Sequence, residues 1–165
     1  MSDLQNIRSI AGILGVFAAL GASGTLAQAQ PAAPLVSTIE QRKVVVAADG
    51  RERLEAGEAV GPGDVVQYTV TLRNTTAQAL KNVQATLPIP ANTEYIPASA
   101  RPASITGSAD GTTYGALPLR RTVKRNGVDV TVTLAMRDVR WVRWPAGELA
   151  GGTTATYMAR VRVDK

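Results

Sequence analysis

The sequence predicts an all-β protein, a β-sandwich of about seven to nine short strands. Valine and threonine are abundant from position 36 onward, and β-branched side chains suit a half-buried sheet better than a helix. Several segments alternate between apolar and polar residues, which is the period of a strand with one buried face. Asp-Gly and Asn-Gly pairs separate such segments, as expected for antiparallel strands joined by tight turns.

The composition limits the chemistry that the chain can perform. Of its 165 residues, 45% are hydrophobic but only 4% aromatic, so the core is expected to consist mainly of valine, leucine, isoleucine and alanine. The chain has no cysteine and no histidine, which excludes disulfides, Ser-His-Asp triads and Cys-His pairs. A carboxylate pair, a Ser-Lys dyad and an all-oxygen calcium site stay open.

Residues 1–29 have the pattern of a helical signal peptide. Arg8 precedes the apolar run Ile10–Leu20, and the small residues that follow end in Ala27-Gln28-Ala29. Ala27 and Ala29 fit recognition by signal peptidase, with cleavage after Ala29. The alternative is an uncleaved membrane anchor, for which the run is short and rich in glycine and alanine.

Cleavage defines the rest of the predicted organisation. Residues 30–35 would form a short Pro/Ala tether, and residues 36–165 a single domain. We expect the protein to be exported to the periplasm, the cell surface or the medium, with no membrane partner after cleavage. Its formal charge is +5, so a positive surface is expected there.

The first half of the predicted domain contains several strand-like segments. Val36–Ala47 precedes Asp49-Gly50, a pair that suits a type I′ hairpin turn. The clearest strand alternates between apolar and polar residues from Val66 to Arg73. A later inward-facing set is Val83, Ala85, Leu87 and Ile89. Pro88 and Pro90 end that strand or confine it to a sheet edge.

The second half follows the same pattern. Asn126-Gly127 predicts a two-residue hairpin that joins Arg121–Arg125 to Val128–Met136. Alternate residues of the second segment share one face: Val128, Val130, Val132, Leu134 and Met136. The last strand is expected to direct five residues inward: Ala155, Tyr157, Ala159, Val161 and Val163. No segment after the leader has helical periodicity, so all of these strands are assigned to the sandwich.

Three motifs in order carry a resemblance to a known family. They are Gly63–Asn74 (GDVVQYTVTLRN), Leu87-Pro88-Ile89-Pro90 with Thr93–Ile96, and the spaced residues Trp144, Gly147, Leu149 and Gly152. Together they resemble the bacterial surface-protein domain called "domain of unknown function 11", over roughly residues 60–163, and its small stand-alone proteobacterial members in particular. The resemblance implies an immunoglobulin-like sandwich with Trp144 in its core, in secreted, periplasmic or surface proteins without an established catalytic activity. Asn92 stands where the family usually has glycine, and asparagine tolerates the left-handed conformation.

Acidic residues that could carry chemistry are few and scattered. Glu52, Glu55 and Glu58 surround a predicted turn, whereas a glycosidase-type pair needs two carboxylates about 5 to 10 Å apart in a cleft. Asp110-Gly111 resembles part of a calcium loop but lacks the ladder of acidic residues, so we expect a turn there. No cofactor and no metal are predicted.

Lysine-based chemistry is also open but weakly supported. A Ser-Lys dyad would need a desolvated lysine, such as Lys43, Lys81 or Lys124, beside a serine. Lys43 is also a candidate for an intramolecular Lys-Asn isopeptide crosslink. No asparagine follows Asn126, so the last strand cannot supply the partner.

Basic residues are the most distinctive surface feature. Arg120, Arg121, Lys124 and Arg125 cluster in one predicted hairpin, and Arg160 and Arg162 share one face of the last strand. Arg137, Arg140 and Arg143 alternate with the two tryptophans, Trp141 and Trp144. If Trp144 lies in the core, strand parity directs Trp141 and Arg143 outward together, which suits stacking on a sugar or contact with an anionic polymer. The alternative is that Trp141 caps the sandwich or lies under the hairpin.

These patterns support three functional hypotheses. The first is a non-catalytic envelope or surface module whose basic face binds an anionic polymer, such as lipopolysaccharide or acidic polysaccharide, or a partner protein. Nucleic acid is not an expected partner, because no recognition motif is present. The second is a self-assembling fibre or surface-layer subunit, in which Pro34–Ile39 adds as a strand to a neighbour's sheet. The third is a carboxylate-dependent hydrolase.

Overall fold

The computed structural model describes residues 33–57, 59–145 and 147–165. In this part of the chain there are ten strands, one short 3-10 helix, η1 (Met136–Asp138), and no α-helix. The strands are β1 (Leu35–Val46), β2 (Glu52–Ala56), β3 (Val65–Asn74), β4 (Ala85–Pro88), β5 (Thr93–Tyr95), β6 (Thr106–Ser108), β7 (Arg120–Arg125), β8 (Val128–Thr133), β9 (Trp141–Trp144) and β10 (Thr154–Val163). The all-β prediction is confirmed. The predicted signal peptide, with Ala27 and Ala29, lies outside the described residues, as does Glu58.

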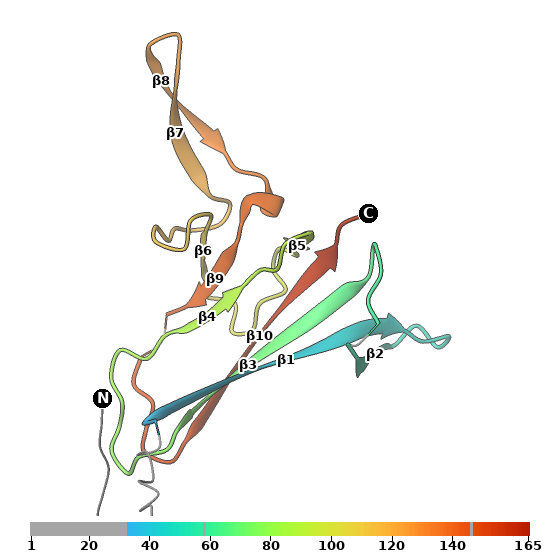
Figure 1. Ribbon diagram of the computed structural model, residues 1–165, viewed down its shortest axis with the longest axis vertical. Helices are drawn as coiled ribbons and strands as arrows, with labels where there is room; N and C mark the ends of the chain where they lie inside the picture. Colours follow the sequence, from blue (N-terminus) through green and yellow to red (C-terminus); the bar gives the residue numbers. More distant parts are fainter. Residues whose placement is uncertain (1–32, 58, 146) are drawn as a thin grey trace, which may run out of the picture. The chain divides into compact units, whose positions relative to one another are not determined.

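The strands form antiparallel sheets of five, three and two strands (Figure 1). The largest sheet has the order β2-β1-β3-β10-β5. β3 lies at its centre, and its alternating sequence gives it one largely apolar face on which Val66, Val70 and Leu72 are buried. Val70 pairs with Ile39 of β1 on one side and with Tyr157 of β10 on the other.

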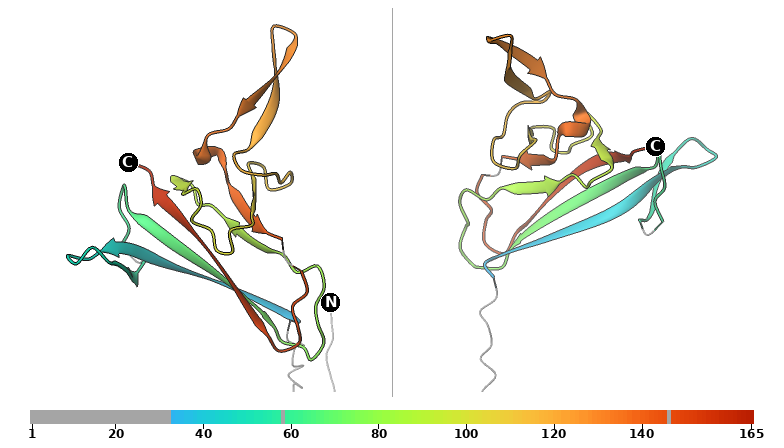
Figure 2. Two further views of the ribbon diagram at one scale, coloured as in Figure 1. Left: turned by 180° about the vertical axis from the view of Figure 1, so that it is seen from behind. Right: turned by 45° about the horizontal axis from the view of Figure 1, so that its top comes forward.

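A second sheet, with the order β4-β9-β6, shares one hydrophobic core with β3 and β10. The views of Figure 2 show β4 and β9 beside one face of the larger sheet. The predicted inward set on and around β4, from Val83 to Ile89, is buried, and β4 ends at Pro88 as expected. Trp144 of β9 is 1% exposed, and its ring lies 5.5 Å from that of Tyr157 between their centroids. Burial of each large apolar side chain contributes about 1.5–3 kcal/mol to stability.

Asn74 fixes one end of this core although it is polar. It is fully buried, and its Nδ2 donates to the carbonyls of Gln78 (2.7 Å), Leu149 (2.9 Å) and Ala150 (3.1 Å). Its Oδ1 accepts hydrogen bonds from the backbone N–H and the hydroxyl of Thr76. A buried amide is tolerated because each of its polar atoms has partners. The side chain thereby ties the end of β3 to the loop that leads into β10.

The two predicted Gly-containing hairpin turns have different outcomes. Arg125 pairs with Val128, so the predicted two-residue hairpin at Asn126-Gly127 is confirmed, and its φ angles of 50° and 80° are those of a type I′ turn. The type I′ prediction for Asp49-Gly50 is wrong, because Gly50 (φ 78°) but not Asp49 has a positive φ. Gly50 N–H instead donates to the carbonyl of Ala47, and Ala47 N–H donates to that of Arg51, which closes a three-residue loop.

The strands predicted within residues 121–136 do form, but they extend neither of the two larger sheets. β7 and β8 form a separate two-stranded sheet, and no third strand of the described chain pairs with either of them. The alternation of Val128, Val130 and Val132 is present, but these side chains are not part of the core cluster. The core receives only the residues just beyond the hairpin, Leu119, Leu134 and Met136. Period-two alternation showed that one face of this hairpin is apolar, but it could not show what covers that face.

Candidate functional site

Four of the predicted basic residues lie together on the β7–β8 arm, which we define as residues 120–133. Its strands pair from Arg120↔Thr133 to Arg125↔Val128. Leu134 N–H donates to the carbonyl of Leu119 (2.9 Å) at the base of the arm, where Leu119 is buried. The arm is therefore anchored in the core at one end and exposed along most of its length.

The arm has a strong positive charge. Four basic residues, Arg120, Arg121, Lys124 and Arg125, and one acid, Asp129, give a formal charge of 4 − 1 = +3. All four basic residues are exposed. Among the described residues its only ion pair, between Lys124 Nζ and Asp129 Oδ1, is 3.8 Å long and largely exposed, so it neutralises little of the charge.

The pairing register divides the four basic residues between two faces. In an antiparallel pair, residues opposite each other share a face. Arg121 and Arg125 therefore share a face with four valines: Val123, Val128, Val130 and Val132. Arg120 and Lys124 lie on the other face with four polar residues: Thr122, Asp129, Thr131 and Thr133. The sequence cluster of four charges is thus two separate pairs, and only one of them borders apolar side chains.

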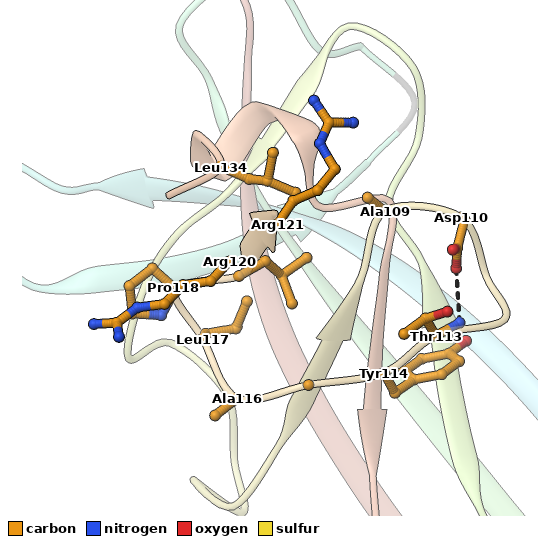
Figure 3. Close-up of a pocket in the computed structure, with 12 residues that line it drawn as sticks. Ala109, Asp110, Thr113, Tyr114, Ala116, Leu117, Pro118, Arg120, Arg121 and Leu134 are labelled. Carbon is orange, nitrogen blue, oxygen red and sulfur yellow. Dashed lines mark hydrogen bonds between the residues drawn. The ribbon is translucent and has the colours of Figure 1, made fainter. Parts of the chain in front are cut away.

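A cavity of about 810 Å³ lies beside the base of the arm. Its walls come from the loop around Tyr114 and Leu117, from the start of β7 and from Leu134 (Figure 3). The side chains of Arg120 and Arg121 point in different directions from β7, as successive strand residues do. Arg120 and Arg121 therefore belong both to the arm and to the rim of a cavity with mixed polar and apolar walls.

Asp110 organises the loop on the opposite side of this cavity. Its Oδ1 accepts hydrogen bonds from the N–H groups of Thr112 (2.8 Å) and Thr113 (2.7 Å) and from the hydroxyl of Ser108 (3.0 Å). These donors hold the pKa of the Asp110 carboxyl far below its usual value. Gly111 has a φ of 77°, so the segment is a turn, as predicted. No group of three acidic side chains suited to a metal occurs in the described ranges.

Trp141 and Arg143 share the outward face of β9, as strand parity predicts, but the loop that follows β6 covers them in part. A Cβ atom added to Gly111 would lie 3.3 Å from the Trp141 ring, so this half-buried ring packs under the turn. The Arg143 guanidinium lies 3.5 Å above the centroid of the Tyr114 ring, and its Nε donates to Thr86 Oγ1. Arg143 thus stacks on Tyr114, which sequence reasoning missed because the contact depends on how a loop folds back.

The basic residues of β10 face a different groove, on the other side of the five-stranded sheet. Arg160 and Arg162 share this face as predicted, beside Val44, Val65 and Met158. Arg160 forms a two-pronged ion pair with Glu52 (Nη2–Oε2 2.8 Å, Nη1–Oε1 3.1 Å), which lowers the pKa of the Glu52 carboxyl. Its Nε also donates to Gln67. Since Arg160 is already paired, this groove offers less free charge than the arm.

The surroundings of Lys43 do not suit a Ser-Lys dyad or a Lys-Asn crosslink, the two lysine chemistries that the sequence left open. Lys43 Nζ lies 2.6 Å from Asp64 Oδ2, which also accepts a hydrogen bond from Gly61 N–H. The Gly61 bond and the lysine together lower the pKa of the Asp64 carboxyl. Lys43 is thus a structural ion-pair partner next to a turn, with a carboxylate rather than a serine or an asparagine against its amine.

Comparison of the chain with protein-family models, with curated proteins and with solved structures gives no match. In the part of the chain that the structure describes, no helix has the length and apolar character needed to cross a membrane. The feature that stands out is an exposed, positively charged hairpin anchored in a β-rich core.

Proposed function

We propose that the chain is a non-catalytic binding module of the cell envelope, whose β7–β8 arm binds an anionic envelope polymer or an acidic partner protein. One observation carries the proposal: four exposed basic side chains project from one hairpin with a single weakly paired acid. Arginine provides a planar fork of N–H donors that suits carboxylate and phosphate groups. A cluster of such charges also raises the local concentration of a polyanion.

The proposal also includes an immunoglobulin-like fold and export from the cytoplasm. The order β2-β1-β3-β10-β5, a second sheet and a shared core with Trp144 inside are compatible with an immunoglobulin-like sandwich. They are also compatible with the resemblance to domain of unknown function 11, which stays a proposal. Export to the periplasm, cell surface or medium rests on the leader pattern of residues 1–29. An anionic polymer is a chemically suitable partner there for a chain of charge +5.

A retention experiment with a charge-matched control tests the binding role. The arm variant carries R120S, R121S, K124S and R125S, and the control carries R51S, R53S, R73S and K81S at exposed positions of the five-stranded sheet and its loops. Both variants lose four positive charges. We expect the arm variant to elute from an anionic polysaccharide column at much lower salt than the parent chain, and the control to change little. Equal loss of retention in both variants would show that net charge, not the arm, is responsible.

Self-assembly by strand addition is a second candidate, and the sheet edge supports it. β2 pairs with β1 only from Arg42 to Val46, so the outer edge of Leu35–Gln41 has no strand beside it among the described residues. Val36 and Ile39 on this stretch are 40% and 49% exposed. The predicted donor segment Pro34–Ile39 is itself largely paired with β3. This edge would therefore accept a strand from a second copy rather than donate one.

Size-exclusion chromatography and electron microscopy separate this candidate from the first. Replacement of Val36 and Ile39 by lysine places charges on the open edge, which disfavours strand pairing. Concentration-dependent oligomers or filaments that disappear in this double variant would support assembly. A monomer at all concentrations would reject it.

A carboxylate-dependent hydrolase has the least support. A general acid at neutral pH needs a raised carboxyl pKa. The shifted carboxyl groups of the described chain are Glu52, Asp64 and Asp110, and each has a lowered pKa because of hydrogen bonds or a basic neighbour. They are therefore ionised partners in turns and ion pairs.

A further inference from the structure

One face of the arm combines apolar and basic side chains that lie outside the hydrophobic core. Val123, Val130 and Val132 are half-buried by their neighbours within the hairpin, and Val128 near its tip is 63% exposed. None of these valines belongs to the hydrophobic core or to the side chains packed against it. Arg121 and Arg125 stand opposite Val132 and Val128, at the two ends of the apolar strip.

This face differs from that of an ordinary exposed hairpin. The opposite face carries threonines, Asp129, Arg120 and Lys124, which is the composition expected for a surface in water. A two-stranded hairpin is only marginally stable by itself, and a third strand or a packed surface usually covers its apolar face. In the described part of the chain no strand fulfils that role. The strip is therefore suited to an external partner.

The charges restrict what that partner is. A second copy of the arm would bring a charge of +3 against +3, so pairing of two arms is opposed by repulsion. A soluble polysaccharide satisfies the arginines but leaves the valines in water. The surface of an anionic lipid layer satisfies both, because its phosphates accept hydrogen bonds from guanidinium groups and its acyl region accepts apolar side chains.

We propose that the apolar face of the β7–β8 arm lies on the surface of an anionic lipid layer. Val128 and Val130 contact the boundary of the acyl chains, and Arg121 and Arg125 bind headgroup phosphates. The arm lies on the layer and does not span it, because each strand has only six residues. This inference rests on the proposed binding function of the arm and adds an anionic lipid surface to its partners. It departs from the sequence-based expectation that no membrane is a partner after cleavage.

The two faces of the arm provide a matched test in vesicle sedimentation. Vesicles of phosphatidylglycerol are compared with vesicles of phosphatidylcholine, using the chain in the form in which the cell produces it. R121S/R125S and R120S/K124S remove the same charge from opposite faces. We expect R121S/R125S to weaken binding to the anionic vesicles about 30-fold, and R120S/K124S to weaken it no more than about fivefold. Equal losses from the two pairs would overturn the proposal, as would equal binding of the parent chain to both kinds of vesicle.

A second pair of variants separates this inference from the proposed function. V128T/V130T keeps the shape and β-branching of the side chains but makes the strip polar, whereas T122V/T131V makes the opposite face more apolar. We expect V128T/V130T to lose vesicle binding while its retention on anionic polysaccharide is unchanged, and T122V/T131V to bind vesicles as the parent chain does. Undiminished vesicle binding by V128T/V130T would overturn the lipid contact and leave polymer binding intact. If the parent chain bound neither vesicles nor polysaccharide, both proposals would fail. If sedimentation velocity showed a dimer of the parent chain that V128T/V130T does not form, the partner of the strip would be a second copy and the lipid proposal would be overturned.

Discussion

Replacement of Asn74 by alanine tests how the end of β3 is held to the loop that leads into β10. The substitution removes three donated and two accepted hydrogen bonds from a fully buried side chain. The three carbonyl partners keep other donors: that of Leu149 accepts from Leu80 N–H, that of Ala150 from Thr153, and that of Gln78 from the Thr76 hydroxyl. The backbone N–H of Thr76 is the group that loses its acceptor.

The expected loss of stability depends on how many polar groups lose their partners. An unsatisfied, partly buried N–H costs about 1–3 kcal/mol, and the lost net hydrogen bonding and the small cavity add to it. Because the carbonyls keep partners, we expect Asn74→Ala to lower the free energy of unfolding by about 2–4 kcal/mol in total. Urea unfolding followed by tryptophan fluorescence measures this value. Gln84→Ala, at an exposed position, is the control, with an expected change within about 0.5 kcal/mol.

Asn74→Asp should change the free energy of unfolding by an amount that depends on pH. The introduced carboxylate would face three carbonyl oxygens, so its pKa in the folded protein is raised above the unfolded value near 4. A raised pKa means that the variant is least destabilised at acidic pH and loses stability as pH rises through the folded pKa. The difference from the parent chain should therefore grow between pH 4 and 7. A loss below about 1 kcal/mol for Asn74→Ala, or a pH-independent loss for Asn74→Asp, would refute the role assigned to Asn74.

Three further substitutions test local features. The pKa of the Asp110 carboxyl is lowered in the fold, so its contribution to stability is present above the unfolded pKa near 4 and is lost as pH falls. Asp110→Asn should therefore remove that part of the acid-induced loss of stability. Thermal unfolding between pH 2 and 5 measures it. Gly151→Ala places a Cβ 2.2 Å from the carbonyl oxygen of Ala77 and should destabilise the fold by more than about 2 kcal/mol, whereas Gly147→Ala, with no atom within 4 Å, should be close to neutral in the same assay. Gly127→Ala, at φ 80°, should destabilise the arm by about 1–2 kcal/mol, seen as faster amide exchange in β7 and β8 with the core unchanged.

Much of the fold could be predicted from the sequence because burial on one face imposes a period of two. β3, the buried set from Val83 to Ile89, and the inward residues of β10 follow from alternation alone. Asn126-Gly127 predicted a two-residue hairpin turn because both residues tolerate a positive φ. The role of Asn74 could not be predicted, since nothing in its sequence neighbourhood shows that the carbonyls of Leu149 and Ala150, 75 and 76 residues away, converge on it.

The candidate site was predictable in its residues but not in its arrangement. Arg120, Arg121, Lys124 and Arg125 stand out by charge, and strand parity already separates them into two faces. Their separation from the two larger sheets depends on long-range pairing, which alternation does not encode. The cover over Trp141 depends likewise on the turn after β6, whose Asp110 hydrogen bonds are local but whose position over β9 is not.

Hydrogen–deuterium exchange with and without an anionic envelope polymer tests the central claim most directly. The amides of a solvent-exposed two-stranded hairpin exchange readily, so a bound polymer should slow exchange there more than in the already protected β3. We predict new protection confined to residues 120–133, and its loss at high salt. Protection elsewhere, for example around the groove of Arg101 and Arg162, with an unchanged arm would contradict the assignment of the arm as the binding surface.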